Sequence, residues 1–223
     1  YKPSDSSKTI GQIRQRLAQT GDLKLDSKSN VYDEELMAGI LNYKKRNGFN
    51  TDYLIASKHI QRMNIPIENY IKTIIANMER CRWIDPKLTK TDEYIIINIP
   101  SYQFFFKKNG QNELESKVFV GKNMNKTVVL SSNIDKIVFS PYWNIPKSII
   151  ENEIKYAIER DENYLEKHNI EWYKGNLRQK PGPKNSLGLV KFIFPNSNAI
   201  YLHDTPSKSL FDEEKRAFSH GCI

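Results

Sequence analysis

The sequence is poor in cysteine, with two residues in 223, Cys81 and Cys222. So small a number excludes the dense disulfide framework of small secreted domains. Long apolar runs are also missing: none approaches the roughly 20 residues that span a bilayer as a helix, so we predict no transmembrane segment. Ten glycines and ten prolines exclude a collagen-like or low-complexity chain. The chain that remains is globular, since 12 tyrosines and 10 phenylalanines argue against disorder.

Concentrated positive charge is absent too. The 34 Lys and Arg residues outweigh the 26 Asp and Glu residues by 8, but no basic run reaches five residues. No nucleic-acid-binding motif accompanies the charge, so we expect no nucleic-acid partner. A net charge of +8 remains compatible with an anionic cell wall.

The first part of the sequence has a helical pattern. Residues 1–8 are polar and are expected to form a linker. Residues 9–65 carry apolar positions at helical spacing in three short stretches, which predicts a small three-helix domain. Pro66 opens an amphipathic helix that runs to Trp83, so residues 66–92 are expected to form a linking helix. Cys81 lies on the apolar face of that helix, and we expect it to be a buried core residue.

From residue 93 the sequence becomes rich in β-forming residues. Strands are predicted at 94–100, 102–108, 115–121, 126–130, 136–140, 189–195 and 199–203. Asn109-Gly110 predicts a hairpin turn. Polar, helix-compatible sequence at 147–169 and a Gly/Pro-rich loop at 175–188 interrupt the strands. We therefore predict an α+β chain: a helical domain and a mainly β domain (93–223) with an insertion at about 147–180.

The candidate chemistry lies at the end of the chain. Cys222 follows Ser219, His220 and Gly221, which are small or polar residues that let a ligand approach the backbone. A free thiol with a pKa of about 8.5 needs an imidazole or a positive environment to become a good nucleophile. His220 and His203 could each supply the imidazole, and Asp204 could orient that of His203. From the residues alone, a structural role for Cys222 stays open.

Other kinds of site have little support. His203, His220 and Cys222 lack the paired spacing of a structural zinc site. The sequence contains neither a Walker-type loop nor a dinucleotide fingerprint. We therefore expect no metal and no cofactor.

The last 47 residues resemble a known catalytic core. The stretch 177–223, LRQKPGPKNSLGLVKFIFPNSNAIYLHDTPSKSLFDEEKRAFSHGCI, resembles the L,D-transpeptidases of the YkuD family, which place a histidine ahead of an SHGC segment. It looks closest to the large periplasmic, YcbB-like branch. NIPSYQFFF (98–106), FVGK (119–122) and SPYWNIPKSI (140–149) resemble the strands and cleft wall of that branch. The first helical stretch resembles its peptidoglycan-binding-like domain.

The resemblance implies a role for each residue of the motif. Cys222 would attack the carbonyl of the third residue of a peptidoglycan stem peptide, and His203 would be the general base. The amides of Gly221 and Cys222, with His220, would form an oxyanion hole. Ser219 and Asp204 would position this motif.

The resemblance also implies a substrate cleft. Tyr201 lies two residues before His203, so both side chains project from the same side of a strand. Tyr201 and Trp143 would line the cleft, and Arg178 would meet stem-peptide carboxylates. Core packing for the two aromatic residues and a solvated loop for Arg178 are the alternatives.

The activity implied is an L,D-transpeptidase that forms 3–3 cross-links and releases D-Ala, with stem peptides as donor and acceptor. Carbapenem β-lactams would be covalent inhibitors, and the setting would be periplasmic or cell-envelope. The alternatives are a non-catalytic peptidoglycan-binding protein and an L,D-carboxypeptidase that uses the same cysteine. The family motif continues with an arginine and further sheet, so we expect the polypeptide to continue beyond Ile223, and a segment preceding this chain could tether it to the membrane.

Overall fold

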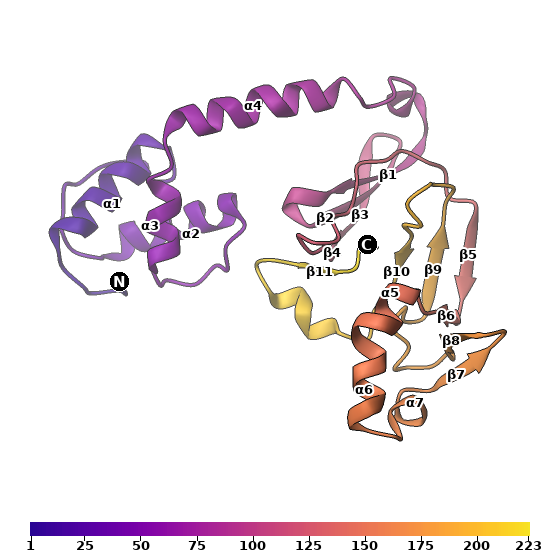
Figure 1. Cartoon of the computed structure of the whole chain (residues 1–223). Coiled ribbons are helices and arrows are strands. Elements are labelled where there is room, and N and C mark those ends of the chain that lie inside the picture. Colours follow the sequence, from indigo (N-terminus) through magenta and orange to yellow (C-terminus); the bar gives the residue numbers. More distant parts are fainter. The chain divides into compact units, whose positions relative to one another are not determined.

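The structure is a computed structural model that describes residues 1–223, apart from the side chain of Thr89. The chain forms two compact units, Tyr1–Lys90 and Thr91–Ile223, which we describe one at a time (Figure 1). The first unit is helical. The second is built mainly of short strands with helices among them. The chain is therefore an α+β protein, as predicted.

The first two helices of the first unit each start next to a side chain that caps them. Its helices are α1 (Lys8–Gln19), α2 (Glu34–Asn47), α3 (Ser57–Met63), α4 (Ile67–Cys81) and η1 (Leu88–Lys90). Helix α1 starts after Ser7, whose hydroxyl accepts the N–H of Ile10, and α2 starts after Asp33, whose carboxylate accepts the N–H of Leu36. Such caps satisfy amide groups that the first turn leaves without a partner. Gly48 ends α2 in the left-handed conformation, with φ of 72°.

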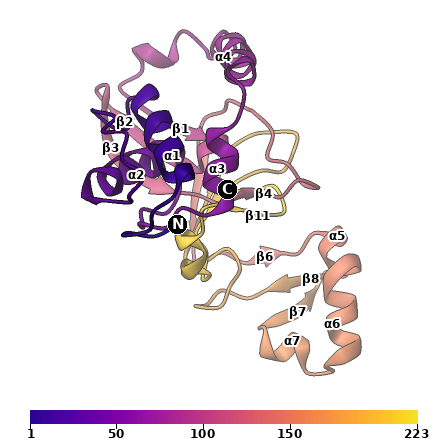
Figure 2. The same cartoon turned by 90° about the vertical axis from the view of Figure 1, so that its left-hand side faces the viewer.

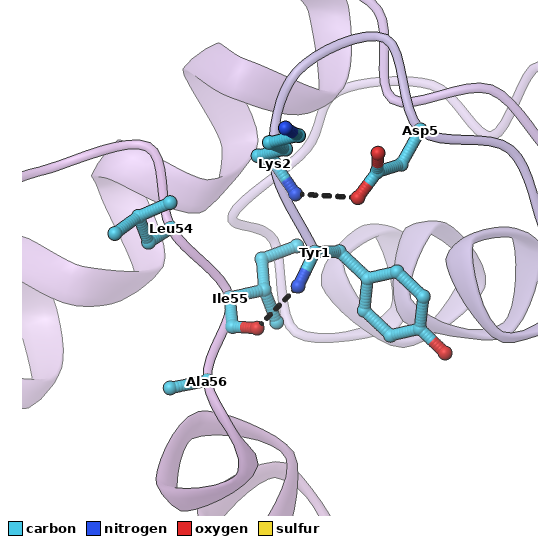
Figure 3. Close-up of a pocket in the computed structure, with 6 residues that line it drawn as sticks. All are labelled: Tyr1, Lys2, Asp5, Leu54, Ile55 and Ala56. Carbon is cyan, nitrogen blue, oxygen red and sulfur yellow. Dashed lines mark hydrogen bonds between the residues drawn. The ribbon is translucent and has the colours of Figure 1, made fainter.

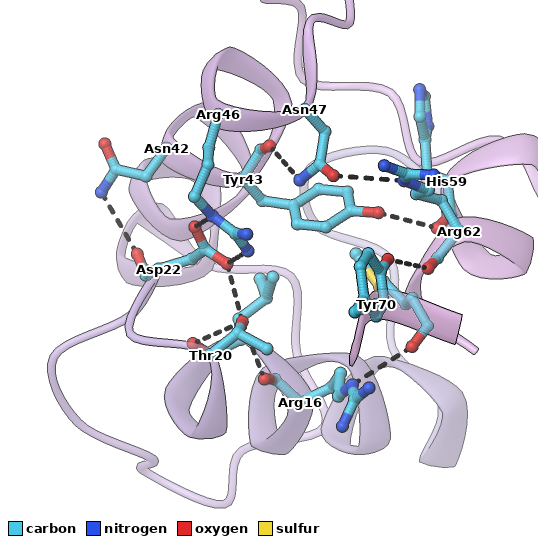
Figure 4. A network of polar contacts seen from close by, with 12 residues as sticks. Arg16, Thr20, Asp22, Asn42, Tyr43, Arg46, Asn47, His59, Arg62 and Tyr70 are labelled. Atoms are coloured by element: carbon cyan, nitrogen blue, oxygen red, sulfur yellow. Dashed lines mark hydrogen bonds and ion pairs between the residues drawn. The ribbon is translucent and has the colours of Figure 1, made fainter. Parts of the chain in front are cut away.

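A hydrophobic core and a polar network hold these helices together. The core includes Ile10, Leu17, Leu36 and Ile40, all almost completely buried. In the network, the carboxylate of Asp22 accepts two hydrogen bonds from Arg46, and the hydroxyl of Tyr43 donates to the carbonyl of His59 (Figure 4).

The N-terminal residues, expected to be a linker, are hydrogen-bonded to this helical unit. The N-terminal ammonium of Tyr1 donates to the carbonyl of Ile55 at 2.7 Å (Figure 3). The amide of Ser4 donates to the carbonyl of Tyr32, and the amide of Tyr32 donates to that of Asp5. A shallow pocket beside them is lined by Tyr1, Lys2, Asp5, Leu54, Ile55 and Ala56.

Helix α4 corrects one prediction. We expected Cys81 to be buried on its apolar face, but Cys81 is exposed. The same is true of Ile67, Ile71, Ile74, Ile75 and Met78. The spacing of the apolar residues did indicate a helix, but burial also requires a second surface against that face, and the first unit supplies none among its described residues. In the described part of the chain, no helix combines the length and apolar character needed to cross a membrane.

The second unit contains four small sheets. Its strands are β1 (Glu93–Asn98), β2 (Gln103–Lys108), β3 (Gln111–Lys117), β4 (Val120–Gly121), β5 (Lys136–Phe139), β6 (Trp143–Asn144), β7 (Ile170–Tyr173), β8 (Asn176–Gln179), β9 (Val190–Ile193), β10 (Leu202–His203) and β11 (Ala217–Ser219). Its helices are η2 (Ile99–Ser101), α5 (Lys147–Ile149), η3 (Ile150–Ile154), α6 (Lys155–Arg160), α7 (Tyr164–Lys167) and η4 (Lys208–Asp212). The sheet orders within the described residues are β1-β2-β3, β10-β9-β5, β11-β4 and β6-β8-β7.

The β2–β3 hairpin confirms the turn prediction. Asn109 and Gly110 both have positive φ, 49° and 76°, as a two-residue type I′ turn requires. The predicted strand at 126–130 is wrong, because this segment is irregular. Instead of joining a ladder, Thr127 uses its hydroxyl to accept the N–H of Gly121 and to donate to the carbonyl of Gly221.

The segment at 147–180 combines helices and strands. Helices α5, η3, α6 and α7 confirm the helix-compatible sequence at 147–169. The loop prediction at 175–188 is wrong at its start, because residues 176–179 form β8, paired with both β6 and β7. The helices and this sheet share a core of Ile145, Ile149, Ile154, Ile170 and Leu177. Figure 2 shows α5, α6 and α7 beside β7 and β8 as a distinct part of the second unit.

Candidate active site

His203 is held at the end of β10 with one ring nitrogen engaged. Strand β10 pairs with β9, where Lys191 is the residue opposite His203. Nδ1 of His203 lies 2.5 Å from the carbonyl oxygen of Asp204. A carbonyl only accepts hydrogen bonds, so Nδ1 carries the proton and Nε2 is left as a basic lone pair. Burial lowers the pKa of His203, and Lys191 lowers it further, which outweighs the opposing effect of the Asp204 carbonyl. The imidazole is therefore neutral at neutral pH.

Backbone hydrogen bonds place Cys222 beside the same strand. Ile223 donates its N–H to the carbonyl of Tyr201 at 3.2 Å, and its carbonyl accepts the N–H of His203 at 2.9 Å. These two hydrogen bonds hold Ile223 alongside β10. Cys222 is half-buried, and its Sγ lies 3.9 Å from the carbonyl oxygen of Ala199. The chain brings a cysteine to the strand that carries His203, which is 19 positions earlier in the sequence.

The surroundings of Cys222 keep it in the thiol form. Burial raises its pKa, while hydrogen bonding from Tyr201 and the charge of Lys191 act in the opposite direction without cancelling the effect. The phenol of Tyr201 also stays protonated, because burial and the neighbouring Cys222 raise its pKa. The rings of Tyr201 and His203 lie 5.6 Å apart. Among the described residues, no hydrogen bond links Sγ of Cys222 to the ring of His203. Both groups are close enough to Lys191 for its charge to affect their pKa values.

The loop before the cysteine is held by its own side chains. Ser219 Oγ accepts the N–H of Gly221 at 3.1 Å and donates to the carbonyl of Cys222. Gly221 has φ of 122°, a conformation that other residues rarely adopt. Its N–H, predicted as an oxyanion donor, is therefore engaged within the loop. The N–H of Cys222 has no acceptor among the described residues, so it is the amide available to an approaching oxyanion.

His220 and Asp204 each have a partner outside the motif. Nε2 of His220 lies 2.7 Å from the carboxylate of Glu153, in η3, and both side chains are exposed. The carboxylate of Asp204 accepts the N–H of Leu189 at 3.0 Å and pairs with Lys208. Burial acts to raise the pKa of Asp204, but these hydrogen bonds outweigh it and hold the pKa below its usual range. It is the backbone carbonyl of Asp204 that orients His203, while its carboxylate fixes the surrounding loop.

Two of the three residues predicted to bind substrate lie near the thiol. The ring of Tyr201 lies 5.6 Å from that of His203, and Cys222 and Trp143 are both close enough to Tyr201 to affect the pKa of its phenol. Arg178 is engaged elsewhere. Its guanidinium pairs with Glu171 at 2.7 Å and stacks over the rings of Tyr142 and Tyr173 at 4.1 and 3.5 Å.

Lys191 is the site residue that sequence reasoning missed. Its Nζ lies 3.6 Å from the centroid of the Tyr201 ring, and its charge affects the pKa of both Cys222 and His203. The signal was present in the predicted strand LVKFIFP (189–195), where one lysine interrupts an apolar run. A lysine in such a strand has to be paired, exposed or directed into a site.

A thiol, a neutral imidazole of fixed tautomer and an unpaired amide suit acyl transfer through a cysteine. Residues 92–223 match the model of the YkuD family, the L,D-transpeptidase catalytic domain. Because the match covers more than half of the chain, the chain belongs to the YkuD family of L,D-transpeptidases.

Two individual proteins are similar to this chain. A Haemophilus influenzae protein named "Putative L,D-transpeptidase" is 36% identical over 150 residues, which is 58% of this chain and 30% of that protein. The chain thus spans about a third of the length of this curated relative. The crystal structure of an L,D-transpeptidase (Yku) from Stackebrandtia nassauensis is 13% identical, with a TM-score of 0.39, and covers 100% of this chain and 82% of that chain.

Proposed function

We propose that this protein is a cysteine-dependent L,D-transpeptidase that forms 3–3 cross-links in peptidoglycan. The observation that carries the proposal is the hydrogen bonding of Ile223 to Tyr201 and His203, which places the Cys222 thiol beside the strand of a neutral, oriented imidazole. Membership of the YkuD family supports the reaction class.

Cys222 acts as the nucleophile. As its sulfur attacks the carbonyl carbon of the third stem residue, the thiol proton passes to Nε2 of His203. The tetrahedral intermediate then expels D-Ala, whose amine takes that proton from His203, and a thioester remains. An amine of a second stem attacks the thioester, gives its proton to His203, and the proton returns to sulfur as the cysteine leaves. One imidazole serves as base and acid in both halves.

The neutral pair fits this order of proton transfers. A raised thiol pKa and a lowered imidazole pKa keep both groups uncharged until substrate arrives. The structure contains no Sγ–imidazole hydrogen bond among the described residues, and such contacts commonly tighten only when substrate binds. The amide of Cys222 stabilises the developing oxyanion, and the Ser219 and Gly221 contacts hold that amide in place.

The wider assignments belong to the same proposal. We infer a place in the YcbB-like branch, with residues 9–65 as a peptidoglycan-binding-like domain, residues 66–92 as a linking helix and the segment 147–180 as a cap over the substrate. The link between His220 and Glu153 supports the last point, because it joins the nucleophile loop to that segment. Peptidoglycan as substrate implies a periplasmic or cell-envelope location.

A carbapenem tests the nucleophile directly. The full-length protein is incubated with the carbapenem, and its intact mass is measured. A single adduct is expected in the unaltered protein and in Cys81→Ala, which removes the exposed thiol, and none in Cys222→Ala. An adduct that persists in Cys222→Ala, or that disappears in Cys81→Ala, refutes the assignment of the nucleophile.

Product analysis then tests the reaction. With a tetrapeptide stem as donor, mass spectrometry is expected to show cross-linked dimers and released D-Ala. Tripeptide without dimers would identify a carboxypeptidase instead. No turnover together with binding to purified sacculi would identify a non-catalytic binding protein.

A further inference from the structure

A pocket opens beside the proposed nucleophile. It is formed by the end of β9 and the turn that leads into β10, and it is lined by Asp135, Lys191, Ile193, Phe194, Pro195, Asn196, Ala199, Ile200 and Tyr201. Two of the lining residues are close to Cys222: the carbonyl oxygen of Ala199 lies 3.9 Å from Sγ, and Tyr201 affects the pKa of the thiol. A group bound in this pocket would therefore lie next to a carbonyl under attack by Cys222.

Lys191 is an unpaired cation in that pocket. Its ammonium lies over the Tyr201 ring, 3.6 Å from the centroid. Among the described residues, no carboxylate forms an ion pair with it and no oxygen accepts a hydrogen bond from it. Lys191 is partly buried, and burial lowers its pKa. An ammonium removed from water without an anion is unfavourable, so the site would gain stability from an anionic ligand.

The other polar groups of the pocket are already engaged. Asp135 is exposed and lies 3.5 Å from the ammonium of Lys136. The amide of Asn196 donates to the carbonyls of Phe194 and Ile200, and its oxygen accepts the N–H of Ile200. Asn196 thus holds its own turn together. Among the charged side chains that line the pocket in the described structure, Lys191 is the cation, and no acceptor takes a hydrogen bond from its ammonium; most of the other lining side chains are apolar.

We propose that this pocket is a carboxylate-binding subsite, in which Lys191 pairs with a carboxylate of the donor peptide close to the scissile amide. The inference rests on the proposed function, because it identifies the donor peptide as the ligand. Two carboxylates have the required chemistry: that of the terminal D-Ala, and that at the end of a diaminopimelate side chain in the third position.

Binding tests this without turnover. In the full-length Cys222→Ala protein, calorimetry measures the affinity for a tetrapeptide with diaminopimelate in the third position and a free terminal carboxylate. Lys191→Met is expected to weaken binding by about 10- to 100-fold, the range for a lost hydrogen bond to a charged group. Lys191→Arg is expected to retain most of the affinity. Lys184→Met removes the same charge from an exposed position and is expected to leave the affinity unchanged.

Changes in the peptide distinguish the two sources and do not depend on how a variant folds. If the terminal carboxylate is bound, its amide derivative loses affinity for the Lys191 protein and becomes insensitive to Lys191→Met. If the side-chain carboxylate is bound, a peptide with lysine in the third position, which lacks that carboxylate, loses affinity for the Lys191 protein and becomes insensitive to Lys191→Met. Equal affinity of all three peptides for the Lys191 protein, or no binding of any, overturns the subsite. Failure of the transpeptidase proposal is seen separately, as the absence of a carbapenem adduct at Cys222.

Discussion

Gly188 allows the carboxylate of Asp204 to come close to the backbone. Its φ is 60°, and a Cβ at this position would lie 2.3 Å from Oδ2 of Asp204. Real Cβ atoms do not approach other heavy atoms that closely, so Gly188→Ala has to displace the carboxylate. That movement would break the hydrogen bond from the N–H of Leu189, at 3.0 Å, and shift the residue whose carbonyl orients His203.

The cost has two parts, which a matched variant separates. An alanine in the left-handed region costs about 1–2 kcal/mol, and a lost hydrogen bond to a charged group about 1.5–3 kcal/mol. Gly175 has φ of 78° with nothing within 4 Å of the added Cβ, so Gly175→Ala has the first cost alone. We expect Gly175→Ala to lower the free energy of unfolding by about 1–2 kcal/mol, and Gly188→Ala by about 2.5–5 kcal/mol.

The two variants should also differ in reactivity. Urea unfolding gives the stabilities, and intact-mass kinetics give the rate of carbapenem acylation at Cys222. Misplacement of the His203 ring is expected to slow acylation by roughly 10- to 100-fold in Gly188→Ala, with little change in Gly175→Ala. Equal losses of stability in the two variants would refute the contact argument, and an unchanged acylation rate in Gly188→Ala would refute the positioning role of Asp204.

Three further predictions concern the same site. Because burial raises the pKa of Cys222, its alkylation by iodoacetamide, measured in Cys81→Ala, should be slow at neutral pH. The rate should rise only at a higher pH than for a free cysteine in a short peptide, whose pKa is about 8.5; a rise at lower pH than in the peptide would indicate a preformed thiolate. Burial lowers the pKa of His203 in the folded state, so as pH falls below about 6.5 the imidazole is protonated in the unfolded state before it is in the folded state, which destabilises the fold. His203→Gln should therefore reduce the loss of unfolding free energy in acid. The same dependence of stability on pH in both proteins would contradict this. Ser219→Ala removes both contacts of the loop hydroxyl and should slow acylation about tenfold, with Ser219→Thr retaining most of the rate; equal rates for all three proteins would rule out this role.

The local sequence predicted most of the helices and strands, because the patterns that indicate them involve residues close together in the chain. The Asn109-Gly110 turn, the strands at 136–140 and 189–195 and the helices within 147–169 all appear. The wrong predictions concern segments whose structure depends on pairing with residues far away in the sequence. The segment 126–130 has the composition of a strand but is irregular, and Asn176–Gln179 reads as part of a loop but pairs with two strands. A ladder needs a partner whose identity is not contained in the segment itself.

The sequence by itself narrowed the proposed chemistry: two cysteines, an SHGC segment and a histidine at a predicted strand end leave few candidates for the nucleophile and the base. Tertiary structure decided which groups surround them. Pairing of β9 with β10 places Lys191 opposite His203, and the carbonyl of Asp204 selects the tautomer of the imidazole. Cys222 is partly buried by its surroundings, which raises its pKa, whereas Cys81 is exposed. These outcomes depend on contacts between residues far apart in the chain and on the exclusion of water, which no local pattern specifies.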